Sequence, residues 1–363
     1  MASNKNQHYV PQCYLREFAT DSTSAAINLY NLDREKFIIN ASIKHQCSKN
    51  YFYGNNLLLE KAMQPIESNY SKVLKEIKNE NYQLNEEHRN FLRLFWLLQY
   101  MRTEAASKRS IEMTHEMGKV AGIDANEYKL SLKEAVQNAM MYFYKNNGVV
   151  DDLKICLIRN KSDIDFITSD DPAVLTNRWH LIDERTKGTS FGLGTAGNIM
   201  LLPLSPRILC VGYDGGVYSL QHKKGWVVVN NKADIHAFNA HQFLNCNANI
   251  FAHNINNEEY LQVLNSEVKP RRPEVRHKIN YAILDSEENG SKRYKVVNRH
   301  EAGEHEEAII HSESIHANPA TWPRQIRWRD KGFVFSNGSG IGYIRKKSAD
   351  TMPHDGFMKV RLR

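Results

Sequence analysis

The spacing of apolar residues changes near the middle of the chain. In the first half, apolar positions recur with the period of a helix over three stretches, residues 60–78, 84–119 and 126–145. After residue 150 they form short runs typical of strands, at residues 153–159, 165–168, 173–175, 199–202, 208–213 and 226–229. Helices that precede strands predict an α+β fold, with a helical N-terminal half packed on a mixed or antiparallel sheet.

Shorter elements complete the predicted core. Residues 91–101 are apolar around most of a helical circumference, which predicts a central, buried helix. The other expected elements are strands at residues 26–30, 36–39 and 250–252 and a helix at residues 232–244.

The helical half carries three candidate polar residues. Pro65 suits the first turn of a second helix better than a helix interior, so the pattern places Glu60 and Glu67 on different helices. Arg102 lies on the central helix among apolar neighbours, and a buried arginine needs a carboxylate or phosphate partner. Either a ligand supplies that partner, or Arg102 forms a salt bridge within the fold, to Glu67 or Asp170.

The opening stretch, residues 6–18, reads NQHYVPQCYLREF. Pro11 pushes the residue before it towards an extended conformation, so His8 is expected at the end of an extended lead-in. A helix should follow, with one face packed through Tyr14, Leu15 and Phe18. His8 is then either a functional group or a satisfied histidine in a buried N-terminal segment.

A second polar cluster lies at residues 166–172, FITSDDP. A strand delivers Thr168, Asp170 and Asp171 into a turn that Pro172 stiffens. Two adjacent carboxylates are costly to bury together, so at least one should face solvent, a cation or an arginine. Such carboxylates suit metal-assisted or general acid–base chemistry. The alternative is an Asx turn that caps a corner of the sheet.

The last quarter of the chain holds the whole basic excess. Residues 269–363 contain 19 Lys and Arg against 12 Asp and Glu, whereas residues 1–268 contain 29 of each. A Pro- and Arg-rich linker at residues 269–273 divides a core domain (1–268) from a small, strand-rich C-terminal module (269–363). Bases interleaved with aromatic rings can hold nucleic-acid phosphates while rings stack on bases. The candidates are Lys292, Arg293, Arg324, Arg327, Trp328, Arg329, Arg345, Lys346 and Lys347; a protein partner and solvated strand faces are the alternatives.

Composition excludes several classes of protein. The longest apolar run is far too short to span a membrane, and no apolar signal core directs export. Five scattered cysteines without a CxxC pair indicate a reduced, cytoplasmic chain without a zinc ribbon. The chain lacks HExxH, GxSxG and a complete phosphate loop, so no nucleotide or organic cofactor is indicated.

In order, HYVPQCYLREF, the acidic helices around Glu60 and Glu67, LLQYMRT, FITSDDP, PLSPR and the Asn-rich stretch at 239–247 resemble the domain of unknown function 4238 family, over about residues 7–255. That family is bacterial and cytosolic, and some members act against phage, so the resemblance implies a defence role without an established reaction. The family's polar positions fall on Thr168 and on the six residues predicted to be catalytic: His8, Gln12, Glu67, Arg102, Asp170 and Asp171.

One shared pocket of these residues would suit phosphodiester cleavage. Asp170, Asp171 and Glu67 would hold a divalent cation, Mg²⁺ or Mn²⁺, and Arg102 would stabilise the charge on phosphorus. The leading hypothesis is therefore a metal-dependent nuclease of RNA or DNA with a basic C-terminal module that binds nucleic acid. The alternatives are a non-catalytic sensor of nucleic acid or of a phage protein trigger, and a modifying enzyme with an aromatic wall of Tyr9, Tyr51 and Tyr53. A homo-oligomer is left open.

Overall fold

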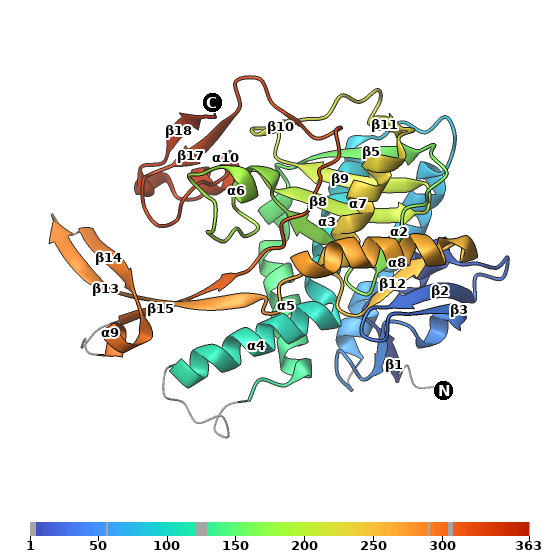
Figure 1. The fold of residues 1–363 in the computed structure, drawn as a ribbon, viewed down its shortest axis with the longest axis horizontal. Helices are drawn as coiled ribbons and strands as arrows, with labels where there is room; N and C mark the ends of the chain where they lie inside the picture. The colour runs from blue at the N-terminus through green and yellow to red at the C-terminus, as the bar shows by residue number, and fades with distance from the viewer. Residues whose placement is uncertain (1–4, 56, 121–128, 289–290, 304–307, 363) are drawn as a thin grey trace.

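The computed structural model describes residues 5–55, 57–120, 129–288, 291–303 and 308–362 (Figure 1). Its helices are α1 (Gln12–Leu15), α2 (Leu58–Ile77), α3 (Glu86–Arg102), α4 (Glu104–Val120), α5 (Leu132–Asn146), α6 (Arg178–Ile182), α7 (Lys232–Asn245), α8 (Glu258–Val268), α9 (Arg299–Gly303) and α10 (Lys346–Asp350).

The strands are β1 (Asn6–His8), β2 (Ala26–Asn31), β3 (Lys36–Ser42), β4 (Ser48–Asn50), β5 (Lys154–Asn160), β6 (Thr168–Ser169), β7 (Val174–Thr176), β8 (Ile199–Ser205), β9 (Ile208–Tyr213), β10 (Tyr218–Ser219), β11 (Trp226–Val229), β12 (Asn249–Ala252), β13 (His277–Glu288), β14 (Ser291–Val297), β15 (Ala308–Ser314), β16 (Arg327–Trp328), β17 (Phe333–Ser336) and β18 (Met358–Arg361). The α+β class predicted from the sequence is confirmed.

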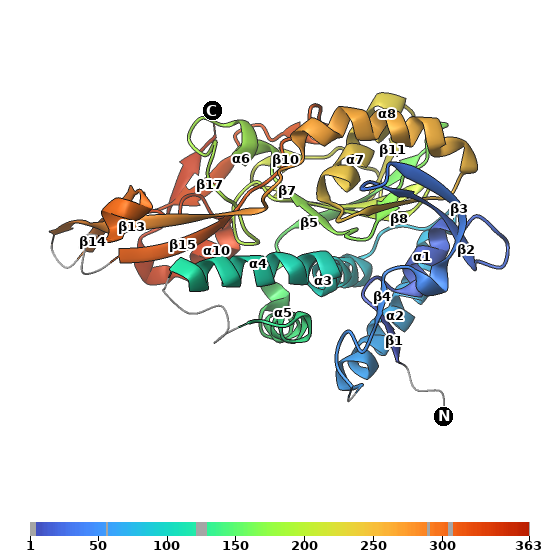
Figure 2. The same cartoon turned by 60° about the horizontal axis from the view of Figure 1, so that its bottom comes forward.

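Two sheets form the centre of the molecule. A mixed five-stranded sheet has the order β11-β5-β9-β8-β7, with β11 parallel to β5 and the other pairs antiparallel. An antiparallel four-stranded sheet has the order β3-β2-β12-β6. Figure 2 shows the layers: α7 and α8 lie on one side of the sheets, and α3 and α5 on the other.

The large sheet is buried on both faces. Ile155 and Leu157 of β5 join the hydrophobic cluster of α2 and α3, whereas Cys156 and Ile158 join the cluster of α7. A strand covered on both faces needs no polar alternation, which explains the continuous apolar runs at β8 and β9.

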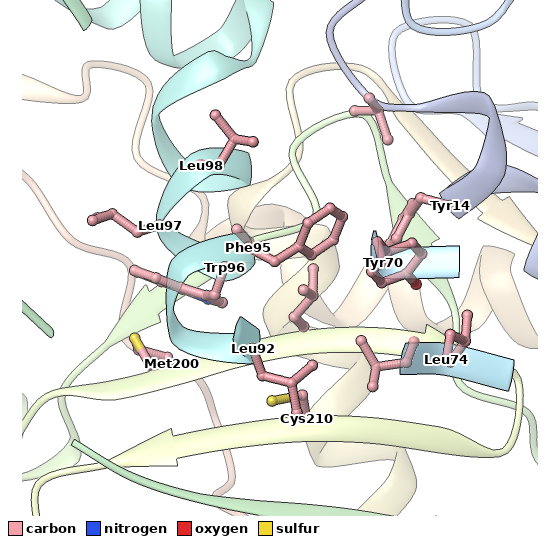
Figure 3. Close-up of a cluster of buried hydrophobic side chains, with 14 of the residues drawn as sticks. Tyr14, Tyr70, Leu74, Leu92, Phe95, Trp96, Leu97, Leu98, Met200 and Cys210 are labelled. Carbon is pink, nitrogen blue, oxygen red and sulfur yellow. The ribbon is translucent and has the colours of Figure 1, made fainter. Parts of the chain in front are cut away.

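Helix α3 is the central, buried helix that its apolar circumference predicted. The ring of Phe95 stacks on Tyr70 of α2 with centroids 4.1 Å apart, and the indole Nε1 of Trp96 donates to the carbonyl of Leu201, 3.2 Å away (Figure 3). Helix α3 thereby ties α2 to the large sheet and fixes where its own last residue, Arg102, lies.

Two helix boundaries differ from the prediction. Pro65 does not start a new helix but lies inside α2, because it occupies the exposed side while Met63, Tyr70 and Leu74 anchor the buried side. The stretch predicted as one helix from residue 84 to residue 119 breaks at Thr103, whose backbone is extended. The hydroxyl of Thr103 accepts a hydrogen bond from the amide of Ala106, which starts α4 afresh.

Helix α5 begins at a capping box formed by Ser131 and Glu134, several residues after the start predicted at 126. Residues 126–128, the beginning of that predicted helix, lie outside the described residues.

The C-terminal residues do not form one separate module. The three-stranded sheet β14-β13-β15 projects from the body beside α4 (Figures 1 and 2). The chain then returns to the core: β16 pairs with β10, and Ile326 and Val334 join the hydrophobic cluster of α7. Residues beyond about 320 are therefore part of the main body.

Cys13, Cys47, Cys156, Cys210 and Cys246 are all free, as their scattered positions predicted. Within the described ranges, no helix combines the length and the apolar character needed to cross a bilayer.

Buried histidines make the fold sensitive to acid. His241 of α7 is 2% exposed beside Trp322, and burial lowers its pKa to about 4. Between pH 7 and pH 4 the unfolded chain takes up a proton at this position while the folded chain stays neutral, so stability falls as pH falls. With an unfolded pKa of about 6.5, this residue removes about 2 kcal/mol at pH 5.

Substituting His241→Gln should therefore make the variant gain about 2 kcal/mol relative to the wild type between pH 7.5 and pH 5. Urea unfolding followed at both pH values measures this difference. A constant gap between the two proteins would contradict a neutral, buried His241.

Candidate functional site

The N-terminal segment presents His8 at the rim of a pocket. Strand β1 pairs with β4, and the Gln7 side chain, fully buried, bonds the carbonyl of Gly54 and the amide of Tyr53. Pro11 then holds an extended backbone before α1 begins at Gln12. This anchoring leaves His8 half-buried, four residues before Gln12, with both side chains in the pocket.

Helix α2 supplies the opposite wall. Because Pro65 does not break the helix, Glu60 and Glu67 lie on one helix, contrary to the prediction, and two turns apart on one face. Gln64 and Ser71 continue the same face at four-residue steps from Glu60 and Glu67. Together with Ser68 and Cys13, these residues enclose an open, polar pocket of about 380 Å³.

Arg102 lies beneath this pocket and fixes its parts. Its side chain is 1% exposed, and Nη2 donates to Glu67 Oε1 (2.9 Å) and to the carbonyl of His8 (2.8 Å). Its Nε donates to the hydroxyl of Tyr53 (2.9 Å). Burial alone would lower the pKa of Arg102, but Tyr53 and Glu67 outweigh it and raise that pKa. Glu67 is thus the carboxylate partner that the sequence predicted for a buried Arg102. Arg102 holds Glu67 and the His8 backbone in place, so it is a positioning residue.

The hydrogen bonds of His8 select one neutral tautomer. Nε2 lies 3.2 Å from the carbonyl of Lys44, which can only accept, so Nε2 carries the proton. Nδ1, 3.5 Å from the amide nitrogen of Gln12, is then the unprotonated atom. Burial lowers the pKa of His8 below its usual range, with smaller opposing effects from Lys44 and Glu67. His8 therefore carries an unprotonated Nδ1 at neutral pH, and its lone pair is directed at the amide N–H of Gln12.

The two glutamates have different partners. Glu67 is paired with Arg102, whereas burial and the nearby charge of Glu67 raise the pKa of Glu60. Burial also raises the pKa of the Cys13 thiol to about 11, so this cysteine is protonated at neutral pH. The pocket thus pairs a neutral histidine with a carboxyl that holds its proton more readily than usual, and it lacks a thiolate at Cys13.

Asp170 and Asp171 belong to other hydrogen-bond networks. Asp170 is 4% exposed, and its carboxylate accepts three backbone N–H groups, from Asn247 (2.8 Å), Ala248 and Asn249 (both 2.9 Å). Burial still raises its pKa, to about 6. Asp171 is fully buried and bonds Arg109.

Residues on either side join this acidic turn to the core. The hydroxyl of Thr103 donates to Asp171 (2.7 Å), and the hydroxyl of Thr168 bonds that of Tyr14 (2.7 Å). The residues of the predicted single pocket therefore fall into two groups. His8, Gln12, Glu67 and Arg102 meet, whereas Thr168, Asp170 and Asp171 brace the fold.

The three carboxylates predicted to share a metal ion are accordingly separate. Asp170 accepts three backbone amides, Asp171 is bonded by Thr103 and Arg109, and one oxygen of Glu67 is paired with Arg102. Across the described ranges, no three His, Cys, Asp or Glu side chains are arranged to hold one ion. The donor set of Asp170, Asp171 and Glu67 does not fit a divalent cation as it stands.

Many of the basic residues predicted to bind nucleic acid serve the fold. Arg345 is 3% exposed and bonds Asp152 and the carbonyl of Val149, so it cannot meet a partner. Arg324 pairs with Asp234 and Lys347 with Asp151. The remaining predicted contacts are as follows: Arg327 bonds Gln221, Arg329 bonds the carbonyl of Gly215, Trp328 packs on Tyr218, and Lys292 and Lys346 are exposed. The side chain of Arg293 lies outside what the structure describes.

Sequence reasoning missed several pocket residues. Gln64, Ser68 and Ser71 follow once α2 is continuous, because their spacing from Glu67 is helical. Of the three tyrosines considered as an aromatic wall, Tyr9 and Tyr53 are buried, and the Tyr53 hydroxyl bonds Arg102.

The chain is thus an α+β protein with a polar pocket between its N-terminal segment and α2. Residues 6–256 match the family model described as "Protein of unknown function (DUF4238)", so the chain belongs to that family. Neither the curated proteins nor the solved structures contain a match.

Proposed function

We propose that this pocket cleaves phosphodiester bonds in RNA, and that the protein is a cytoplasmic nuclease effector of bacterial defence against phage. The observation that carries the proposal is the meeting of a neutral His8, Gln12 and two glutamates in one open pocket over a fixed arginine. The defence role and the cellular location are those that the family resemblance implies.

His8 Nδ1 is the proposed general base. It takes the proton of the ribose 2′-hydroxyl, whose oxygen attacks the adjacent phosphorus. The bond from phosphorus to the 5′-oxygen breaks, and protonated Glu60 gives its proton to that leaving oxygen. The products are a 2′,3′-cyclic phosphate and a 5′-hydroxyl. Proton transfers of this kind each contribute about 10²–10⁴-fold to a rate.

Donors at the rim support an anionic substrate. Arg16 is exposed and its Nη2 donates to Gln12 Oε1, 3.2 Å away, so a guanidinium lies next to the neighbour of His8 at the rim. Because Asp170, Asp171 and Glu67 do not form one donor set, no step uses a metal ion. A base without a metal ion acts most directly on a hydroxyl that the substrate itself holds beside the phosphorus, which favours RNA, with its 2′-hydroxyl, over DNA.

The test is incubation of the purified chain with labelled tRNA, mixed RNA, single-stranded DNA and duplex DNA, in Mg²⁺, in Mn²⁺ and in chelator. We expect RNA to be cut in all three conditions, with cyclic phosphate ends. Cleavage that disappears in chelator would replace the acid–base mechanism with metal chemistry. Intact nucleic acid throughout would overturn the proposal and favour a sensor that binds a phage component.

The pH dependence of RNA cleavage should be bell-shaped. Activity requires neutral His8, whose pKa is lowered below 6.5, and protonated Glu60, whose pKa is raised above 4.5. The rate therefore falls in acid as His8 is protonated and falls in alkali as Glu60 ionises. We expect the maximum of kcat/KM below pH 7, measured with one RNA between pH 4 and pH 9. A rate that rises through pH 8 would contradict these assignments.

A further inference from the structure

A second, larger groove opens where the strands of the large sheet end. It has a volume of about 890 Å³. Arg159 to Lys161 at the end of β5, Ser205 to Ile208 between β8 and β9, and Lys78 just after α2 line it. The groove is distinct from the His8 pocket, with which it shares no lining residue.

Positive charge prevails in this groove. Lys78, Arg159, Lys161 and Arg207 line it together with the carboxylates of Glu17, Glu80 and Asp165. Two of these carboxylates are already neutralised: Lys78 Nζ lies 2.5 Å from Glu17, and Arg207 Nη2 lies 2.9 Å from Asp165. Arg159, Lys161 and Glu80 are then the remaining charges in the lining, a net of one positive charge.

Arg159 is oriented to receive an anion. Its guanidinium carbon lies 4.3 Å from the centroid of the Trp226 ring, so the planar group is held at the aromatic face. Stacking uses the flat side of a guanidinium and leaves its edge N–H groups for hydrogen bonds, which suits phosphate oxygens. Lys161 is exposed two residues further along and adds a point charge.

Helix α2 connects the groove with the His8 pocket. The face that carries Glu67 and Ser71 continues at helical spacing through Lys75 to Lys78. Eleven residues of helix from Glu67 to Lys78 correspond to about 16 Å. The N-terminal segment follows the same path, since Cys13 lies against Glu67 and Glu17 against Lys78.

We propose that the groove binds the sugar–phosphate backbone of single-stranded RNA, as an extension of the strand whose cleavage occurs at His8. The path of the strand from the groove to His8 rests on the proposed function. At about 3.4 Å per stacked nucleotide, 16 Å corresponds to about five nucleotides, so a mononucleotide cannot reach both places. The groove therefore supplies the contacts to the RNA backbone. The Lys and Arg side chains of the C-terminal residues do not, because many of them already form ion pairs or hydrogen bonds within the fold.

The test measures binding without cleavage. Fluorescence anisotropy with a 12-nucleotide, fully 2′-O-methylated strand gives Kd for the full-length chain, because that strand has no free 2′-hydroxyl to react. The double variant Arg159→Gln/Lys161→Gln should raise Kd about tenfold. The slope of log Kd against log salt concentration should fall by the amount expected for the loss of about two phosphate contacts. Lys161→Gln alone, at an exposed position, should give part of that loss if the double variant folds poorly.

Matched controls distinguish the loss of charge in the groove from the loss of charge elsewhere on the surface. Lys129→Gln/Lys133→Gln removes two exposed charges away from the groove and should leave Kd unchanged. Wild-type affinity in the groove variant, or a larger loss in Lys292→Gln/Lys346→Gln, would overturn the inference. A duplex or a protein ligand that binds through Arg159 more tightly than the single strand would also overturn it.

The two proposals can fail separately. Groove-dependent binding of the methylated strand with no cleavage of ordinary RNA would sink the nuclease proposal and retain the binding site. Cleavage with an unchanged KM in the groove variant would do the reverse.

Discussion

Replacing Asp170 by alanine is expected to lower the free energy of unfolding by about 3 kcal/mol at pH 7. The carboxylate accepts the backbone N–H groups of Asn247, Ala248 and Asn249, and these hold the turn between α7 and β12 against the large core. Each donor left buried without a partner costs about 1–3 kcal/mol, and relief of the buried charge offsets part of the sum.

Urea unfolding of Asp170→Ala beside Asp163→Ala measures this effect. Asp163 is exposed and its ion pair with Lys232 is at the surface, so its removal should cost less than about 1 kcal/mol. Equal losses in the two variants would contradict a bracing role for Asp170.

Replacing His8 by glutamine is expected to reduce RNA cleavage by about 10²–10⁴-fold. Glutamine keeps a polar side chain of similar reach at the Lys44 carbonyl and beside Gln12, but it cannot take up a proton. Because Gln7, Pro11 and Arg102 hold the segment through other atoms, the variant should unfold at nearly the wild-type temperature.

The matched control is His45→Gln, which changes an exposed histidine near the same segment but outside the pocket. Its cleavage rate should equal that of the wild type. Loss of activity in both variants, or in neither, would remove His8 from the reaction.

The order of helices and strands could be predicted because helical periodicity marks the helices of the first half, and short, continuous apolar runs mark buried strands such as β8 and β9. The break at Thr103 was not readable. It depends on Asp171, which is 68 residues away in sequence and accepts the Thr103 hydroxyl. Pro65 misled for a related reason: the packing of Tyr70 and Leu74 outweighs the preference of one exposed proline.

Residue type predicted part of the site. A buried arginine called for a carboxylate, and Arg102 finds Glu67. The adjacent aspartates were predicted to face solvent, a cation or an arginine. Asp171 is paired with Arg109, whereas Asp170 accepts hydrogen bonds from backbone amides. Backbone amides of a loop far away in the sequence cannot be predicted as partners from the residues around Asp170. For the same reason the composition of the C-terminal segment did not reveal that Arg345 is buried at Asp152.

Chemistry is proposed to occur in the pocket of His8 and Glu60, and not at Asp170. Single-turnover cleavage of one RNA by His8→Gln and by Asp170→Asn, with each rate referred to the folded fraction of the protein, tests this most directly. We predict a loss of at least about a hundredfold for His8→Gln and a rate within a few-fold of the wild type for folded Asp170→Asn. A wild-type rate in His8→Gln together with an inactive, folded Asp170→Asn would contradict a reaction at His8 and would place it at Asp170.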